Sequence, residues 1–203
     1  MKPIYIVLIV LAVVFGLILV LGGGYFLWTK SAYNNIIARD EAVKAKWGAV
    51  QSQYQRRSDL IPNLVATVKG VANFEKSTLV DVTNARARAT SIQVDPTKLT
   101  PANVQQYQAA QGQLSSALSR LLVASERYPD LKANQNFTDL QASLEGTENR
   151  INVARMDFNE AVQQYNVTIR SWPASIVAAN KGFTEKGSFT ADEGAQNAPK
   201  VSF

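Results

Sequence analysis

The sequence predicts an all-α protein in which an N-terminal transmembrane helix is followed by an elongated antiparallel bundle of about four long helices. An uncharged run extends from Pro3 to Thr29, and charged residues are interleaved with apolar ones in the remainder. There the apolar residues recur at steps of three and four, as in a helix with one buried face, and strand-like alternation is absent. These patterns divide the chain into an anchor (1–30), a helical bundle (31–180) and a flexible tail (181–203).

The uncharged run is long enough to span a membrane, because about 20 apolar residues cross a hydrocarbon core of roughly 30 Å. A cleavable signal peptide is the alternative, with an apolar core of about 7 to 15 residues and a small-x-small cleavage site. This run is longer and ends in three glycines followed by bulky aromatic residues. Tyr25 and Trp28 suit the headgroup region, so we expect a retained anchor.

The charges that flank the anchor favour a cytoplasmic position for the C-terminal domain. Lys2 precedes the run, whereas several cations follow it: Lys30, Arg39, Lys44 and Lys46. An excess of cations in a short flank marks the cytoplasmic side, but long domains can translocate regardless of charge. The sequence therefore gives only a slight preference for this orientation.

The first part of the bundle carries a helical stripe of apolar residues: Tyr33, Ile36, Ile37, Val43, Trp47, Val50 and Tyr54. The stripe resumes after Pro62 and extends to Val82. Because proline lacks a backbone donor and disfavours helix in the preceding residue, we expect a kink or a break at Pro62. Ser58 or Asp59 would cap the restart, and the segment would end at 93–97.

Two further helices complete the predicted bundle. Thr100 and Pro101 are typical of an N-cap followed by proline at the first helical position. This helix would end near Pro129, and a loop would extend through Asn136. The last helix carries a near-heptad stripe that stops before Pro173. Long striped helices with short connections indicate an antiparallel bundle.

The segment 181–203 is rich in small and polar residues and contains only isolated apolar ones. Such a segment buries too little surface to offset its chain entropy, so we expect it to be largely disordered. Within it, the segment Val201-Ser202-Phe203 forms either a docking tip or part of an inert tail.

Several motifs resemble those of the bacterial LemA family. The first is QRRSDLIPNLVATVKG at 55–70. The second begins with LEGTENRI at 144–151, continues through Arg155, Asn159 and Tyr165-Asn166, and ends with RSWP at 170–173. Tyr33-Asn34 and APKVSF at 198–203 accompany them. The resemblance covers nearly the whole chain. It implies a bacterial inner-membrane protein with one N-terminal anchor and an elongated antiparallel helical domain. It implies no established activity, although relatives include a protein used in building magnetosome membranes.

The first motif places polar residues around the proline: Arg56, Arg57, Asp59 and Asn63. Arginine forks bind phosphate or carboxylate groups bidentately, so one interpretation is a phosphate or lipid-headgroup site. The favoured interpretation is structural. In it the aspartate and asparagine cap a broken helix, and the arginines pair with Glu145 or Glu148 of the last helix.

The second motif holds a polar cluster: Glu148, Asn149, Arg150 and Arg155. Glu148 and Arg155 are seven residues apart, so they lie on one helix face. If the first motif packs against this face, an arginine–glutamate–asparagine network would fix the register of two long helices without adding much net stability.

The composition argues against several classes of function. The chain contains no histidine and no cysteine, which removes the usual bases, nucleophiles and soft metal ligands. No cofactor motif occurs, so we expect no enzyme activity and no cofactor. Arg86 and Arg88 form a small basic spot, but no aromatic residues accompany it, which favours a solvated helix face over nucleic-acid binding.

These observations favour a non-catalytic, membrane-anchored scaffold. Its expected partners are the lipid bilayer and other membrane or envelope proteins, including further copies of the chain. Two alternatives stay open: a lipid-engaging module that shapes membranes, and a regulator of a neighbouring membrane protease.

Overall fold

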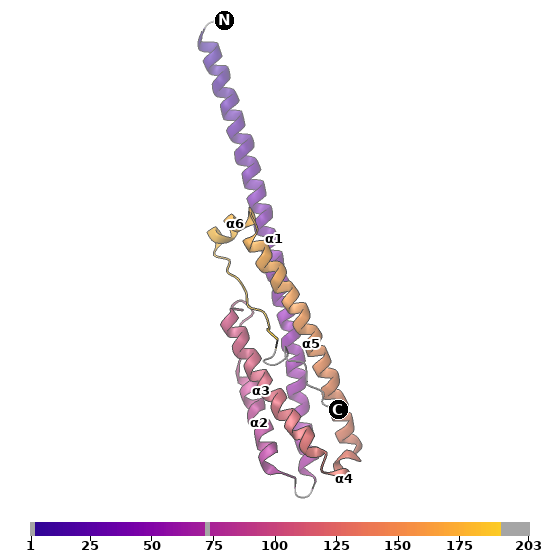
Figure 1. Cartoon of the computed structure of the whole chain (residues 1–203). Coiled ribbons are helices and arrows are strands. Elements are labelled where there is room, and N and C mark those ends of the chain that lie inside the picture. Colours follow the sequence, from indigo (N-terminus) through magenta and orange to yellow (C-terminus); the bar gives the residue numbers. More distant parts are fainter. Residues whose placement is uncertain (1–2, 72–73, 192–203) are drawn as a thin grey trace, which may run out of the picture. The chain divides into compact units, whose positions relative to one another are not determined.

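The computed structural model describes residues 3–71 and 74–191, with side chains from Leu8 onward (Figure 1). Every regular element in this part is a helix, which confirms the predicted fold class. The elements are α1 (Pro3–Lys69), α2 (Lys76–Ser91), α3 (Pro101–Ser125), α4 (Pro129–Lys132), α5 (Gln135–Arg170) and α6 (Ala174–Lys181).

The described residues form two compact units. One, here called the anchor unit, contains the described residues of 1–41 and 164–185. The other, here called the bundle unit, contains those of 42–163 and 186–203.

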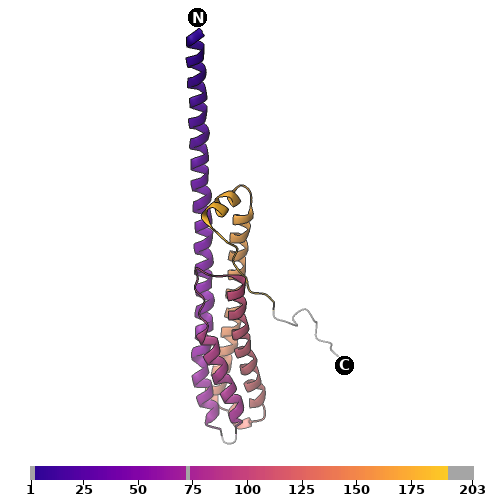
Figure 2. The same ribbon diagram turned by 90° about the vertical axis from the view of Figure 1, so that its left-hand side faces the viewer.

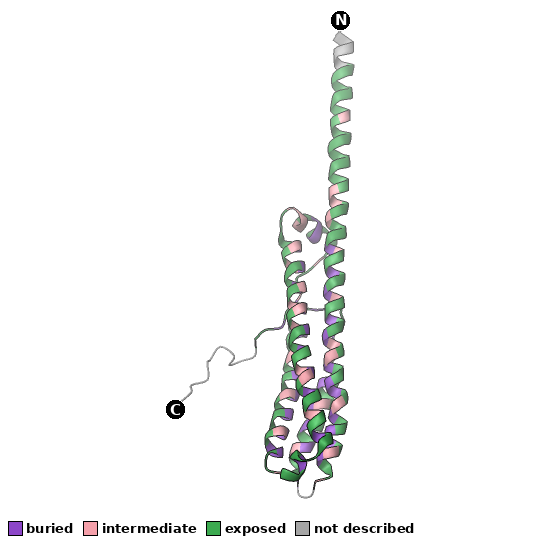
Figure 3. Ribbon diagram, turned by 90° about the vertical axis from the view of Figure 1, so that its right-hand side faces the viewer, coloured by how far each residue is buried: buried purple, intermediate pink, exposed green. Residues whose placement is uncertain are grey.

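In the anchor unit the first part of α1 exposes its apolar side chains, which Figure 3 shows as a nearly continuous exposed segment. The mean hydropathy of its most apolar 18-residue window is 2.6, and none of that window is buried. By length and composition, α1 is the one helix of the described part that is able to cross a membrane. The ring centroids of Tyr25 and Trp28 lie 5.8 Å apart after this segment.

The anchor unit also joins the end of α5 and the segment after α6 to α1. Arg39 Nη1 donates to Gln164 Oε1 at 2.5 Å, and the ring of Tyr33 lies 5.9 Å from that of Phe183. The Tyr165 hydroxyl donates to the Thr184 carbonyl at 3.1 Å.

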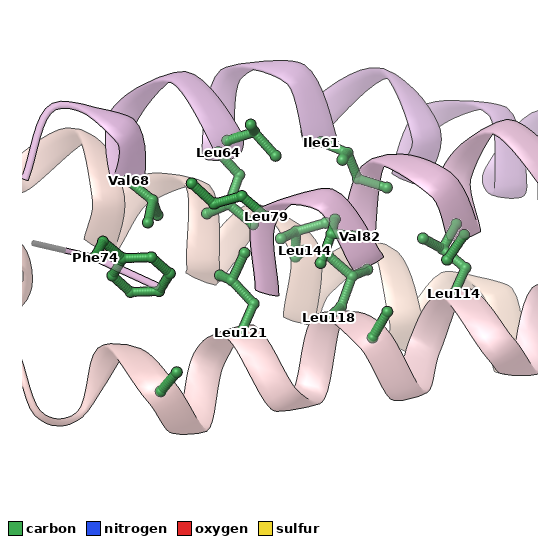
Figure 4. Close-up of a cluster of buried hydrophobic side chains, with 14 of the residues drawn as sticks. Ile61, Leu64, Val68, Phe74, Leu79, Val82, Leu114, Leu118, Leu121 and Leu144 are labelled. Carbon is green, nitrogen blue, oxygen red and sulfur yellow. The ribbon is translucent and has the colours of Figure 1, made fainter. Parts of the chain in front are cut away.

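The bundle unit is built around an apolar core to which α1, α2, α3 and α5 all contribute (Figure 4). α2 and α3 lie side by side in both ribbon views (Figures 1 and 2). The core residues follow the stripes seen in the sequence, because side chains at steps of three and four share one helix face. Representative members are Ile61, Leu64, Val68, Leu79, Val82, Leu114, Leu118, Leu121 and Leu144.

The expected break at Pro62 is wrong, because α1 continues through it to Lys69. A proline at position 62 removes the hydrogen bond that the carbonyl of Ser58, four residues earlier, would accept. The structure supplies another donor, since Arg86 Nε of α2 donates to that carbonyl at 2.9 Å. The orphaned carbonyl is thereby satisfied, and neither Ser58 nor Asp59 caps a restart. Arg86 is half-buried rather than part of a solvated face.

The chain instead leaves the helix after Lys69 and resumes at Lys76. The expected start of α3 is confirmed: Thr100 Oγ1 accepts from the Asn103 backbone N–H at 3.2 Å, and Pro101 occupies the first turn. α5 begins at Gln135, within the predicted loop, and ends at Arg170 before the predicted stop. The short helices α4 and α6 were not predicted.

The first part of the predicted flexible tail is packed rather than disordered. Phe189 is buried, and Gly187 N–H donates to the Leu99 carbonyl at 2.9 Å. A Cβ at position 187 would lie 2.5 Å from Pro101 Cα, so the close approach requires glycine. One buried aromatic residue with backbone hydrogen bonds outweighs the polar composition that predicted disorder. The predicted docking tip at Phe203 lies outside the described residues.

If Arg86 replaces the donor that Pro62 removes, the effect of deleting it depends on that proline. We expect Arg86→Met to lower the free energy of unfolding by about 1–3 kcal/mol, because it leaves the Ser58 carbonyl unsatisfied. In a Pro62→Ala background the new N–H at 62 serves this carbonyl, and the same change costs less than about 0.5 kcal/mol. Urea unfolding of the unaltered protein, the two single variants and the double variant measures the coupling. An equal loss of unfolding free energy from Arg86→Met in both backgrounds would contradict the explanation.

Candidate functional site: a buried arginine network and a polar groove

Arg57 occupies a core position of α1. It follows the buried Tyr54 by three residues and precedes the buried Ile61 by four, so it lies on the same apolar stripe. Its side chain is only 2% exposed. The sequence thus places a permanent positive charge among core residues, where the charge has to be paired and hydrogen-bonded.

The guanidinium of Arg57 contacts α3 and α5. Nη1 donates to Ser115 Oγ at 2.7 Å and to Glu148 Oε2 at 3.0 Å. Nη2 donates to the side-chain oxygen of Gln111 at 2.7 Å and to its backbone carbonyl at 3.2 Å. The guanidinium carbon also lies 4.9 Å from the ring centroid of Tyr54, within the range of a cation–π contact.

Gln111 extends the network to the remaining long helix. Its Nε2 donates to the Ala89 carbonyl of α2 at 3.3 Å while its oxygen accepts from Arg57. The side-chain amide is therefore used at both ends. Through these two residues one polar network joins α1, α2, α3 and α5, the same helices that build the apolar core.

The positive charge of Arg57 is only partly compensated by its partners. Glu148 pairs with Arg57, but its side chain is 45% exposed, so water screens part of the attraction. Arg57 Nε is buried without a hydrogen-bond partner among the described residues. Taking an ion out of water costs several kcal/mol, so the network acts mainly by permitting one arrangement of helices rather than by adding net stability.

The structure brings together only some of the residues singled out in the sequence. Arg57 meets Glu148, whereas Arg56 is exposed and Asp59 accepts from Gln55 of its own helix at 2.7 Å. The exposed Asn63 contributes its backbone carbonyl to Thr67. Because α1 is unbroken, neither polar residue caps it.

In the second motif, Asn149 and Arg150 are exposed and take no part in the network. Arg155 lies elsewhere: its Nη2 donates to the Thr190 carbonyl at 3.1 Å, and its guanidinium covers the Phe189 ring at 5.0 Å. Arg155 therefore holds the packed segment after α6 rather than the first motif.

That segment rests on an aromatic cluster centred on the fully buried Trp47. The Trp47 ring centroid lies 5.1 Å from that of Tyr107, 5.2 Å from Phe158 and 5.9 Å from Phe189. Burial, with repulsion from Tyr54, raises the pKa of the Tyr107 hydroxyl well above its usual range, so the group is neutral at physiological pH.

Two side-chain amides clamp the backbone of this segment. Asn159 donates to the Phe189 carbonyl at 2.9 Å and accepts from the Phe189 N–H at 2.8 Å. Gln108 makes the corresponding pair with Thr190, at 2.9 and 3.1 Å. Gln108, Gln111 and Ser115 were not singled out from the sequence, because neutral polar residues are common on helices and only the fold shows which ones face a buried partner.

An open groove of about 700 Å³ lies beside the network in the bundle unit. α2 contributes Asp81, Ala85 and Arg88, and α3 contributes a row of residues from Gln108 to Arg120. Arg57, Glu148 and Arg155 complete the lining. The groove is mostly polar, and in the described part of the chain no group of three or more acidic, histidine or cysteine residues is placed to hold a metal ion.

Comparison with known proteins agrees with the resemblance found in the sequence. A model of the LemA family matches residues 46–203. Magnetosome protein MamQ 1 of Paramagnetospirillum magneticum is 25% identical over 191 residues, which cover 84% of this chain and 68% of the relative.

Two further relatives extend the comparison. Magnetosome protein MamQ of Magnetospirillum gryphiswaldense is 26% identical over 170 residues, or 74% of this chain and 62% of the relative. Protein LemA of Metamycoplasma hominis is 24% identical over 176 residues, which cover 87% of this chain and 76% of the relative. Together with the exposed apolar helix, these relatives indicate a membrane-associated protein.

The neighbouring arginines of the first motif should differ sharply in their effect on stability. Arg57→Ala opens a cavity in the core and leaves the side-chain oxygen of Gln111 without its arginine donor, so we expect a loss of about 2–5 kcal/mol in unfolding free energy. Arg56→Ala, at an exposed position, should stay within about 0.5 kcal/mol. Urea unfolding of the full chain in neutral detergent, followed by circular dichroism, measures both. Similar values for the two variants would rule out the buried network.

Proposed function

The chain belongs to the LemA family, and we propose that it is a non-catalytic, membrane-anchored scaffold that binds other membrane or envelope proteins or further copies of itself. The main support for the proposal is the continuity of helix α1. One uninterrupted helix contains both the exposed apolar segment and core residues of the bundle unit, from Ile61 to Val68. The element that would anchor the protein is thus also part of the bundle core.

Exposed apolar residues outside the anchor suggest where partners bind. On α5 of the bundle unit, Val153 is 53% exposed and Met156 is 64% exposed, three residues apart on one face. In the anchor unit, Trp172 is 81% exposed. Large apolar side chains in water favour burial against a partner, and methionine adapts to varied surfaces. Anchoring also confines copies to one plane, which raises their effective concentration.

We place the protein in the bacterial inner membrane as a single-pass protein with its bundle on the cytoplasmic side. The support is the excess of cations after the anchor, Lys30 and Arg39 among them.

A compartment-sensitive reporter fused to the C-terminus checks the orientation. We expect a cytoplasmic signal, and reversing Lys30 and Arg39 to glutamate should weaken the preference, because the flank charges set it. A periplasmic signal from the unaltered protein would contradict the placement and direct the search for partners to the envelope.

A charge placed on the proposed contact face should impair partner binding without unfolding the bundle. We expect Val153→Lys combined with Met156→Lys to reduce recovery of co-purified membrane proteins, or of a second tagged copy, by about tenfold, equivalent to about 1.4 kcal/mol. Asn152→Lys, at an exposed position of the same helix, is the matched control. Mass spectrometry after crosslinking in cells measures recovery. Equal recovery from all three proteins would exclude this face.

A further inference from the structure

The polar groove of the bundle unit carries more positive than negative charge. Four arginines line it, from α1, α2, α3 and α5, against two carboxylates. They are Arg57, Arg88, Arg120 and Arg155, and the carboxylates belong to Asp81 and Glu148. Glu148 is already paired with the buried Arg57 at 3.0 Å. A surplus of two positive charges therefore remains along the groove.

Two of these guanidiniums are unused within the described part of the chain. Arg88 and Arg120 are exposed, and their side chains make no hydrogen bond or ion pair with the described residues. They come from neighbouring helices, α2 and α3. At the same groove, Arg57 is fixed by its network and keeps a buried Nε without a partner. The groove is thus lined by two guanidiniums without a partner in the described part of the chain and by a third that is held by its network.

The rest of the lining suits a small polar ligand. Gln113 and Ser116 of α3 offer neutral donors beside the arginines. The volume of about 700 Å³ lies within the range of small-molecule sites, roughly 300–1,000 Å³. Apolar ligands are disfavoured because the lining is polar, and cations are disfavoured because the net charge is positive. An anion with several oxygens matches both properties.

We infer that this groove binds a phosphate-bearing ligand with at least two anionic groups, held by Arg88 and Arg120. Arginine presents parallel N–H donors that match phosphate oxygens bidentately, and two such forks from separate helices select for a ligand with two anionic groups. The ligand is either a soluble diphosphate-type molecule or the headgroup of an anionic lipid. This site is independent of the apolar contact face proposed for partner proteins.

The test uses the full-length protein in neutral detergent, titrated with pyrophosphate by isothermal calorimetry. We expect saturable binding that Arg88→Ala and Arg120→Ala each weaken by about tenfold or more, since a hydrogen bond to a charged group contributes roughly 1.5–3 kcal/mol. Both side chains are exposed and have no partner among the described residues, so neither change should alter the unfolding curve. Arg150→Ala, at an exposed arginine of α5 outside the groove, is the matched control and should leave binding unchanged.

Two further titrations define the ligand. Mixed micelles containing cardiolipin, whose headgroup carries two phosphodiesters, should displace pyrophosphate if the natural source is a lipid headgroup, and should not if it is a soluble phosphate. Citrate should bind much more weakly than pyrophosphate. The inference is overturned if pyrophosphate and cardiolipin both fail to bind, if citrate binds as tightly as pyrophosphate, or if Arg150→Ala lowers affinity as much as the groove variants.

Discussion

Arg57 is the charge around which the bundle unit has to be assembled, because a guanidinium that is 2% exposed needs its partners in place. Ser115 and Gln111 of α3 and Glu148 of α5 supply them, and Gln111 passes the connection to α2. Apolar stripes alone allow neighbouring helices to slide by a turn, since leucine packs against leucine in many registers. A slide by one turn would separate these partners from Arg57, so the network selects one register.

At Pro62, a side chain from another helix replaces the backbone hydrogen bond that the proline removes. The Ser58 carbonyl that loses its helical donor receives Arg86 Nε at 2.9 Å. Arg86 therefore connects α2 to α1 at Ser58, and the neighbouring Arg57 connects α1 to α3. The result is an unbroken helix that carries the anchor at one end and core residues at the other, and this continuity is the basis of the scaffold proposal.

Periodic apolar residues predicted an all-helical fold with an apolar N-terminal helix, and Thr100 with Pro101 predicted the start of α3, because these features depend on local pattern and capping. The short helices α4 and α6 were not predicted. The continuation through Pro62 was not predictable, because it depends on an arginine 24 positions later in the printed sequence. The packing of Phe189 was not predicted, because the polar residues around it in the sequence indicated a disordered segment. In the site, the sequence suggested that the arginines of the first motif pair with acidic residues of the last helix. It did not suggest Gln111 or Ser115, because no sequence pattern distinguishes them from surface residues.

The central claim is that Arg57 and Gln111 act as one buried unit, and a double-mutant cycle tests it most directly. Urea unfolding of the full chain, of Arg57→Met, of Gln111→Leu and of the double variant gives the interaction energy between the two side chains. The account predicts a favourable coupling of about 1–3 kcal/mol, as for residues that share a buried hydrogen-bond network. Additive effects within about 0.3 kcal/mol would contradict it, because independent side chains cannot fix the register of the helices together.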